Sequence, residues 1–191
     1  YQRNYETGMK RVAIISSSVR TGRLSHRVAL YIKRYLEGNA LAEVDLLDLK
    51  AYDFPLFDER FAFQEHPSEK LVDFTERFNR AQVVWIVTPV YNGSFPASLK
   101  NVIDLYYKEW KRKVAVVTSV TYTKVPPILT IQQLQVILLK LGALVIPAMH
   151  TVIEADKDFD PDGNPRLPDQ ADAFLRPVAD ETLWLADRVQ K

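Results

Sequence analysis

The stretch 88-TPVYNGSFPASLKN-101 decides the fold, because it joins a strand pattern to a helix pattern. The residues before it, 82-QVVWIV-87, form a short apolar run that is typical of a buried strand. Residues 97–110 follow with the spacing of apolar side chains that indicates a helix. A strand, a loop and a helix in this order are the repeating unit of parallel α/β proteins.

The composition of this loop predicts a rigid backbone. Pro89 fixes its own φ and lacks an N–H group, and Pro96 suits the beginning of the next helix. Asn92 and Gly93 form a strong turn signal, because both residues tolerate positive φ. We therefore expect backbone N–H and C=O groups to point into a crevice, with the flat ring of Tyr91 available for stacking on a heterocycle.

The same alternation of apolar strand and helix patterns extends over most of the chain. It predicts an α/β fold with a five-stranded parallel sheet in the order 2-1-3-4-5, covered by helices on both faces. Pro177 is expected to kink or break the last helix. The expected strands are 11–16, 43–49, 82–87, 112–118 and 143–149, and the expected helices are 25–38, 68–80, 97–110, 127–142 and 171–189.

The composition limits the classes of function. The 191 residues have a formal net charge of +1, so neither an acidic nor a basic field indicates a nucleic-acid partner. They contain no cysteine, which excludes thiolate chemistry and cysteine-bound metals among them. No run is long enough to span a bilayer, and no secretory signal pattern opens the sequence. We expect one cytoplasmic domain over residues 9–191, preceded by an extension over residues 1–8.

The loop after the first expected strand reads 16-SSSVRTGRLSHRVA-29 and favours an anion. Its serines and two arginines precede a helix that Ser25 could cap, and a helix N-terminus presents free N–H groups to a phosphate. Neither a P-loop nor a GxGxxG fingerprint is present. A polar loop with an ordinary helix cap explains this segment equally well.

Two motifs together resemble those of the NADPH-dependent FMN reductase family, which has a flavodoxin-like fold and includes quinone, azo and chromate reductases. In the loop after the first strand, Ser18, Arg20, Ser25 and His26 match its Ser-x-Arg…Ser phosphate motif. The resemblance covers about residues 11–150. The second motif is matched by Pro89, Tyr91, Asn92, Ser94, Pro96, Leu99, Lys100 and Asn101.

The resemblance implies an FMN-dependent NAD(P)H oxidoreductase with a flavodoxin-like three-layer sandwich. Hydride would pass from NADPH or NADH through FMN to a small acceptor such as a flavin or a quinone, and the flavin itself would carry the chemistry. The family often has an acidic residue where this sequence has Val90. The implied FMN-binding residues are Ser18, Arg20, Thr21, Gly22, Arg23, Leu24, Ser25 and His26 around the phosphate, and Pro89, Val90, Tyr91, Asn92, Gly93 and Ser119 around the ring.

The loop after the fourth expected strand departs from the family pattern. The family usually has a glycine-rich loop there, whereas 118-TSVTYTKVPP-127 contains no glycine. Fewer backbone conformations with positive φ are open to such a loop, so we expect it to take a different path. Tyr122 could still cap the ring, and Lys124 could meet the phosphates of a nicotinamide cofactor.

Two other functions are compatible with the sequence. The protein could be an FMN-binding electron carrier or sensor without turnover, or a hydrolase with Ser94 as nucleophile, although Pro96 stands where the nucleophile elbow has its second glycine. The histidines, His26, His66 and His150, have no metal-binding spacing, and we expect no metal site and place them at the surface or behind the site.

The apolar and aromatic side chains of residues 97–110 suggest a homodimer or homotetramer. The alternative is that these side chains pack on the chain's own sheet.

Overall fold

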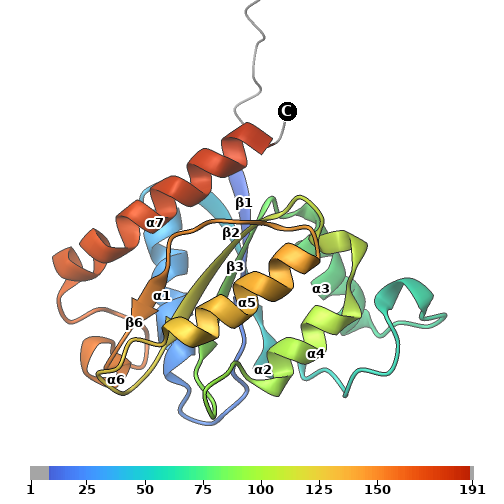
Figure 1. Ribbon diagram of the computed structural model, residues 1–191, viewed down its shortest axis with the longest axis horizontal. Helices are drawn as coiled ribbons and strands as arrows, with labels where there is room; N and C mark the ends of the chain where they lie inside the picture. Colours follow the sequence, from blue (N-terminus) through green and yellow to red (C-terminus); the bar gives the residue numbers. More distant parts are fainter. Residues whose placement is uncertain (1–8, 190–191) are drawn as a thin grey trace, which may run out of the picture.

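The computed structural model describes residues 9–189, and the expected extension at residues 1–8 lies outside them. Its strands form a parallel sheet in the order β2-β1-β3-β4-β5, as the sequence predicts, and a sixth strand also pairs with β4 (Figure 1). The strands are β1 Lys10–Ser16, β2 Ala42–Asp48, β3 Val83–Pro89, β4 Val114–Val120, β5 Leu144–Val145 and β6 His150–Val152.

Helices cover both faces of this sheet, because its strands are apolar on both sides. Helices α3, α4 and α5 cover one face, and α1 and α7 cover the other (Figure 1). Ala13 and Ile15 of β1 pack in the core under the first set, whereas Val12 and Ile14 pack in the core under the second. The helices are α1 Leu24–Gly38, α2 Leu49–Tyr52, α3 Glu69–Arg80, α4 Ala97–Leu105, α5 Ile128–Lys140, α6 Ala155–Asp158 and α7 Pro168–Val189, with 3₁₀ turns η1 Phe61–Phe63 and η2 Lys108–Trp110.

The last expected strand, 143–149, is divided in two. β5 pairs with the beginning of β4 and β6 pairs with its end, while residues 146–149 between them form no strand. Pro147 lies in this gap, and it has no N–H group to donate to a neighbouring strand. The prediction of one strand over 143–149 was therefore wrong, and β6 extends to residue 152 instead.

The expected helix over residues 97–110 ends early, at Leu105. Tyr106 is extended and buried, and its hydroxyl lies 2.8 Å from Thr75 Oγ1 of α3. Trp110 is buried as well, whereas Tyr107 is exposed. Most apolar and aromatic side chains of residues 97–110 thus pack in the chain's own core, so they give no support for an oligomer.

The last helix does not break at its internal proline. It begins at Pro168 and continues without a break through Pro177 to Val189. Pro177 cannot donate the helical hydrogen bond to the residue four positions earlier. The buried side chains of Leu175 and Val178, on either side of the proline, pack in the core and keep the helix on the sheet.

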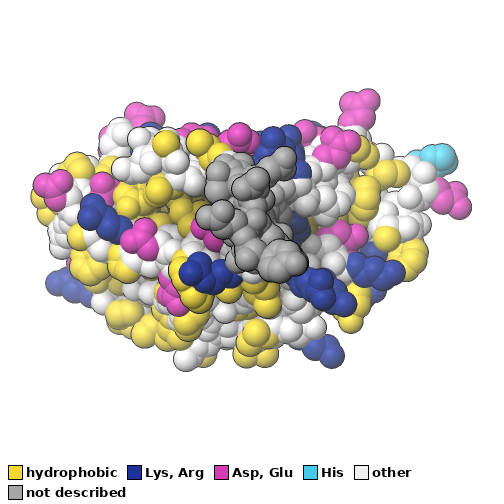
Figure 2. All heavy atoms as spheres, turned by 90° about the horizontal axis from the view of Figure 1, so that it is seen from above, with side chains coloured by type: hydrophobic (Ala, Val, Ile, Leu, Met, Phe, Trp, Pro, Cys, Tyr) yellow, Lys and Arg dark blue, Asp and Glu magenta, His cyan; other side chains and the backbone are white. Residues whose placement is uncertain are grey.

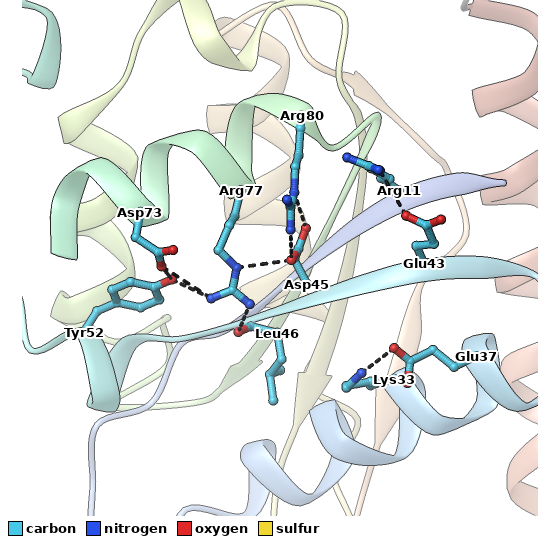
Figure 3. Close-up of polar contacts among 10 residues, drawn as sticks. All are labelled: Arg11, Lys33, Glu37, Glu43, Asp45, Leu46, Tyr52, Asp73, Arg77 and Arg80. Atoms are coloured by element: carbon cyan, nitrogen blue, oxygen red, sulfur yellow. Dashed lines mark hydrogen bonds and ion pairs between the residues drawn. The ribbon is translucent and has the colours of Figure 1, made fainter. Parts of the chain in front are cut away.

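An ionic network fixes the edge strand β2 to α3 (Figure 3). Asp45 accepts hydrogen bonds from Arg77 Nε at 3.1 Å and from Arg80 Nε at 2.9 Å. Arg77 also donates to Tyr52 Oη at 2.8 Å, and Tyr52 donates to Asp73 Oδ2 at 2.6 Å. Burial alone would raise the pKa of Asp45, but the two arginines outweigh it and hold that pKa below its ordinary value.

On the face at the amino ends of the strands, the visible described residues carry interspersed acidic and basic side chains, with no extended area of one sign among them (Figure 2). This distribution agrees with the net charge of +1. Within residues 9–189, no helix combines the length and the apolar character needed to cross a membrane.

Candidate functional site

The loops after β1 and β3 lie side by side at the carboxyl end of the sheet (Figure 1, bottom). Ser17 donates to Val87 O through its N–H at 3.1 Å and through its hydroxyl at 3.0 Å. Ser98 of α4 donates to Ser17 O at 2.6 Å. The hydroxyls of Ser18 and Tyr91 are 2.6 Å apart, so side chains connect the two loops directly.

The N-terminus of α1 opens onto these loops without a side-chain cap. The helix begins at Leu24 with Arg23 in the N-cap position, so the expectation that Ser25 caps the helix was wrong. Ser25 instead lies in the first turn, where its buried hydroxyl has no hydrogen-bond partner. A buried hydroxyl without a partner is costly, and this one lies beside N–H groups that attract an anion.

The two arginines of the first loop have different roles. Arg23 forms a bidentate ion pair with Asp48 at the end of β2, with Nη2 2.6 Å from Oδ2, and it also donates to Ser18 O at 2.8 Å. Burial alone would raise the pKa of Asp48, but hydrogen bonds from Arg23 lower it. The exposed side chain of Arg20 makes no hydrogen bond or ion pair within residues 9–189. Arg20 is therefore the cation that remains available to a ligand.

Gly22 and His26 shape this loop. Gly22 has a φ of +69°, which lets the chain turn from Arg20 into α1. His26 Nδ1 lies 2.9 Å from Ser16 Oγ, beneath the loop. Burial, followed by the positive charge of Arg23, lowers the pKa of His26. His26 is thus held as a neutral ring behind the loop.

The loop after β3 forms the tight turn that the sequence predicts. Tyr91 and Ser94 exchange backbone hydrogen bonds of 2.7 and 3.0 Å, while Asn92 has a φ of 50° and Gly93 a φ of 80°. Positive φ at both central residues is the geometry of a type I′ turn. The N–H groups of Asn92 and Gly93 make no hydrogen bond in the described part of the chain. They therefore form a rigid pair of free donors on the loop after β3.

Ser94 does not have the surroundings of a nucleophile. Its hydroxyl donates to Gln133 Oε1 of α5 at 2.7 Å, and none of the described histidines forms a hydrogen bond with it. Pro96 is the N-cap of α4 and occupies the position at which a nucleophile elbow has its second glycine. The geometry therefore disfavours the hydrolase alternative.

The end of β4 brings a further hydroxyl to the same edge of the sheet. Ser119 pairs in register with Thr88 of β3, and its buried Oγ has no hydrogen-bond partner. The glycine-free loop that follows is held against β6 and α6, because Thr121 N donates to Val152 O at 2.8 Å and Ala155 N donates to Thr121 O at 3.1 Å. No described hydrogen bond joins it to the other two loops, and Tyr122 and Lys124 are exposed on it.

These observations fit a phosphate-bearing flat cofactor. The uncapped N-terminus of α1, the hydroxyl of Ser25 and the guanidinium of Arg20 supply anion donors at one end of the site. The free N–H groups of Asn92 and Gly93 supply donors for a heterocycle beside them. The Ser18 hydroxyl is already engaged by Tyr91 and by Arg20 N at 3.3 Å, so binding phosphate through it requires an exchange of partners.

A parallel sheet in this strand order, with its donors at the carboxyl ends of β1 and β3, defines the flavodoxin-like class of mononucleotide-binding proteins. The family model of the NADPH-dependent FMN reductases matches residues 10–158. The chain belongs to this family.

Curated relatives are similar over part of their length. An NAD(P)H-dependent FMN reductase of Saccharomyces cerevisiae is 34% identical over 122 residues, which are 57% of this chain and 64% of that protein. A quinone reductase of Pseudomonas putida is 32% identical over 115 residues, 58% of this chain and 59% of that protein. The chain thus matches less than two thirds of the length of these relatives.

Solved structures show the same fold. The flavoenzyme NAD(P)H:(acceptor) oxidoreductase FerB from Paracoccus denitrificans has a TM-score of 0.77 at 23% identity, covering 94% of this chain and 98% of that one. An azoreductase from Bacillus anthracis has a TM-score of 0.53 at 16% identity, covering 94% of this chain and 100% of that one. At these identities the likeness concerns the fold alone.

Several residues that build the site escaped the sequence analysis. Asp48 fixes Arg23, Ser98 fixes the first loop, and Gln133 holds Ser94. Gln133 was not distinguishable from the sequence, since α5 also contains Gln132 and Gln135. The pairing of Asp48 with Arg23 and of Ser98 with Ser17 has no local signal, because the partners are 25 and 81 positions apart.

Proposed function

We propose that the protein is an FMN-dependent NAD(P)H oxidoreductase that reduces a small acceptor. The observation that carries the proposal is the buried, unpartnered hydroxyl of Ser25 in the uncapped first turn of α1. Bound FMN supplies the redox chemistry, since it accepts and donates hydride. Membership of the FMN reductase family supports this cofactor, and the P. putida relative supports a quinone as one class of acceptor.

The proposed role of the protein is to bind and orient the flavin. Arg20, Ser25 and the first N–H groups of α1 hold the phosphate, through charge-assisted hydrogen bonds. The N–H groups of Asn92 and Gly93 bind the polar edge of the ring, because the type I′ turn fixes their direction. Ser119 completes the site with its free hydroxyl.

Titration with FMN and with riboflavin tests the phosphate assignment. Arg20→Ala should weaken FMN by about 1.5–3 kcal/mol, the value of a hydrogen bond to a charged group, and should leave riboflavin nearly unchanged. Arg166→Ala, a change at another exposed arginine, should affect neither ligand. Equal losses for both flavins in Arg20→Ala would show that Arg20 does not contact the phosphate.

Turnover distinguishes an enzyme from an FMN-binding carrier or sensor. The FMN-loaded chain should catalyse many cycles of quinone reduction by NADPH or NADH. A single reduction of the flavin without steady-state consumption of quinone would overturn the enzymatic proposal and leave FMN binding intact.

We also propose that the chain forms a homodimer or homotetramer through α5. Leu129, Val136 and Leu139 are 60%, 68% and 60% exposed, and with Gln132 they follow the 3-4-3 spacing of a helix–helix contact. A second copy presents the same stripe and could cover it symmetrically. Val136→Glu should dissociate the oligomer in sedimentation velocity, whereas Phe63→Glu, at an exposed residue on η1, should not. A wild-type monomer would contradict this proposal.

We also propose that the protein acts in the cytoplasm. NAD(P)H is available in the cytoplasm, and a chain without cysteine has no need of an oxidising compartment. Cell fractionation would test it.

A further inference from the structure

A cavity of about 440 Å³ lies between α1, β6, α6 and the beginning of α7. Its volume is in the range of small-molecule sites. No residue of the candidate FMN site lines it. Aromatic and aliphatic side chains make up most of its wall, among them Tyr31, Met149, Val152, Phe159, Leu167 and Phe174.

One polar ring in this wall is held by a buried chain of hydrogen bonds. His150 lines the cavity and is 5% exposed. Its Nδ1 lies 2.9 Å from Thr118 Oγ1, which also accepts a hydrogen bond of 2.8 Å from Trp85 Nε1. The other ring nitrogen, Nε2, makes no hydrogen bond with the described residues, so it is the one available to the cavity.

The hydrogen-bond chain fixes the tautomer of His150. Trp85 Nε1 can only donate, so Thr118 Oγ1 accepts from it and has its own proton to give. Among the described contacts, His150 Nδ1 is the acceptor for that proton. The proton of the neutral ring then lies on Nε2. Burial lowers the pKa of His150 to about 4, so the ring is neutral at pH 7.

The charges at the cavity favour a neutral ligand. Glu154 and Asp158 line it, and none of the lining residues is a lysine or an arginine. Lys157 pairs with Glu154, whereas the carboxylate of Asp158 makes no ion pair with the described residues and repels an anion. The neutral N–H donor of His150 suits an uncharged acceptor such as a carbonyl oxygen. The rings of Tyr31 and Phe159, whose centroids are 5.3 Å apart, favour a flat apolar body.

We propose that this cavity is a second small-molecule site, distinct from the flavin loops, which binds a neutral aromatic carbonyl compound through a hydrogen bond from His150 Nε2. Binding there needs no flavin chemistry, so the proposal does not depend on the proposed function.

Histidine-ring NMR of the purified chain tests this site with acetophenone as the probe, with and without FMN. Acetophenone should shift the ring signals of His150 saturably and leave those of His66 unchanged. Ethylbenzene, which lacks the carbonyl, should bind about tenfold more weakly, as expected for one lost neutral hydrogen bond. Benzoate, which is anionic, should bind more than tenfold more weakly.

Two variants of α7 locate the probe. Ala171→Phe places a ring in the cavity and should lower the acetophenone affinity at least tenfold, whereas Asp180→Phe, at an exposed position of α7, should leave it unchanged. Three results would overturn the proposal: no saturable shift of His150, equal affinity for ethylbenzene, or full affinity in folded Ala171→Phe. The first two need no variant, so they apply even if Ala171→Phe does not fold.

Discussion

Ser18 Oγ and Tyr91 Oη lie 2.6 Å apart and join the loop after β1 to the loop after β3. Both loops contribute donors to the candidate flavin site, so this bond sets the distance between the phosphate end and the ring end before a ligand arrives. Ser18 is fully buried, and its partner Tyr91 is half-buried.

Tyr91→Phe removes this link and should lower the free energy of unfolding. We expect a loss of about 0.5–1.5 kcal/mol without FMN, because one neutral hydrogen bond disappears. Urea unfolding measures it. Tyr107→Phe, at an exposed tyrosine with no described hydroxyl partner, should change nothing. Similar stability of the two variants would show that the Ser18–Tyr91 bond does not hold the loops.

Gly93→Val should impair flavin binding more than Ser94→Ala does. Gly93 has a φ of 80°, where a β-branched side chain costs about 1–3 kcal/mol and turns the N–H donors away. Ser94→Ala removes a hydrogen bond to Gln133 and should cost about 1 kcal/mol of stability without loss of flavin. FMN affinity and quinone reduction are measured for both. Full activity of Gly93→Val would contradict the ring assignment, and complete inactivity of a folded, FMN-loaded Ser94→Ala would restore the nucleophile hypothesis.

Gly163→Ala should destabilise the protein far more than Gly22→Ala. Both glycines have positive φ, +77° and +69°, so each alanine incurs strain of about 1–2 kcal/mol. An added Cβ at Gly163 would also lie 2.3 Å from Arg27 O, whereas nothing lies within 4 Å of one at Gly22. Thermal unfolding of the flavin-free variants measures the difference. Equal melting temperatures would mean that residue 163 does not pack closely on α1.

Asp45→Asn should destabilise the protein at neutral pH and have little effect in acid. The arginine pairs lower the folded-state pKa of Asp45 below its unfolded value of about 3.9, so its contribution is present above that pH and is lost as the pH falls through the folded pKa. We expect about 1 kcal/mol at pH 7, after allowance for solvent screening. Glu43→Gln, in the exposed pair with Arg11, is the control and should have a smaller effect. The free energy of unfolding of wild type and of Asp45→Asn is measured as a function of pH. A difference between the two that does not decrease in acid would refute this account.

The sequence predicted the order and type of the strands and helices better than the residues at which they end or are interrupted. Strands such as Val83–Pro89 begin as short apolar runs rich in β-branched residues, and this length and composition distinguish them from helices. The early end of α4 was not predictable, because it depends on Tyr106 reaching Thr75 of another helix. Helix α7 passes through Pro177 because tertiary packing outweighs local preference.

For the candidate site, the sequence predicted the turn after β3 but not the long-range hydrogen bonds and ion pairs that hold the loops. Asn92-Gly93 encodes its backbone locally, and the structure confirms positive φ at both residues. The choice between Arg20 and Arg23 as the available cation depends on Asp48, which another strand contributes. Flavin contacts by the individual residues of both loops stay predictions until a titration tests them.

The division of the last strand has a consequence for how copies of this protein can meet. β5 has two residues and β6 has three, and Pro147 lies between them, so this margin of the sheet offers no long row of free backbone groups. A foreign strand would find too few partners there to begin fibril-like growth. If copies associate at this margin, we expect them to do so through helices and not through strand pairing.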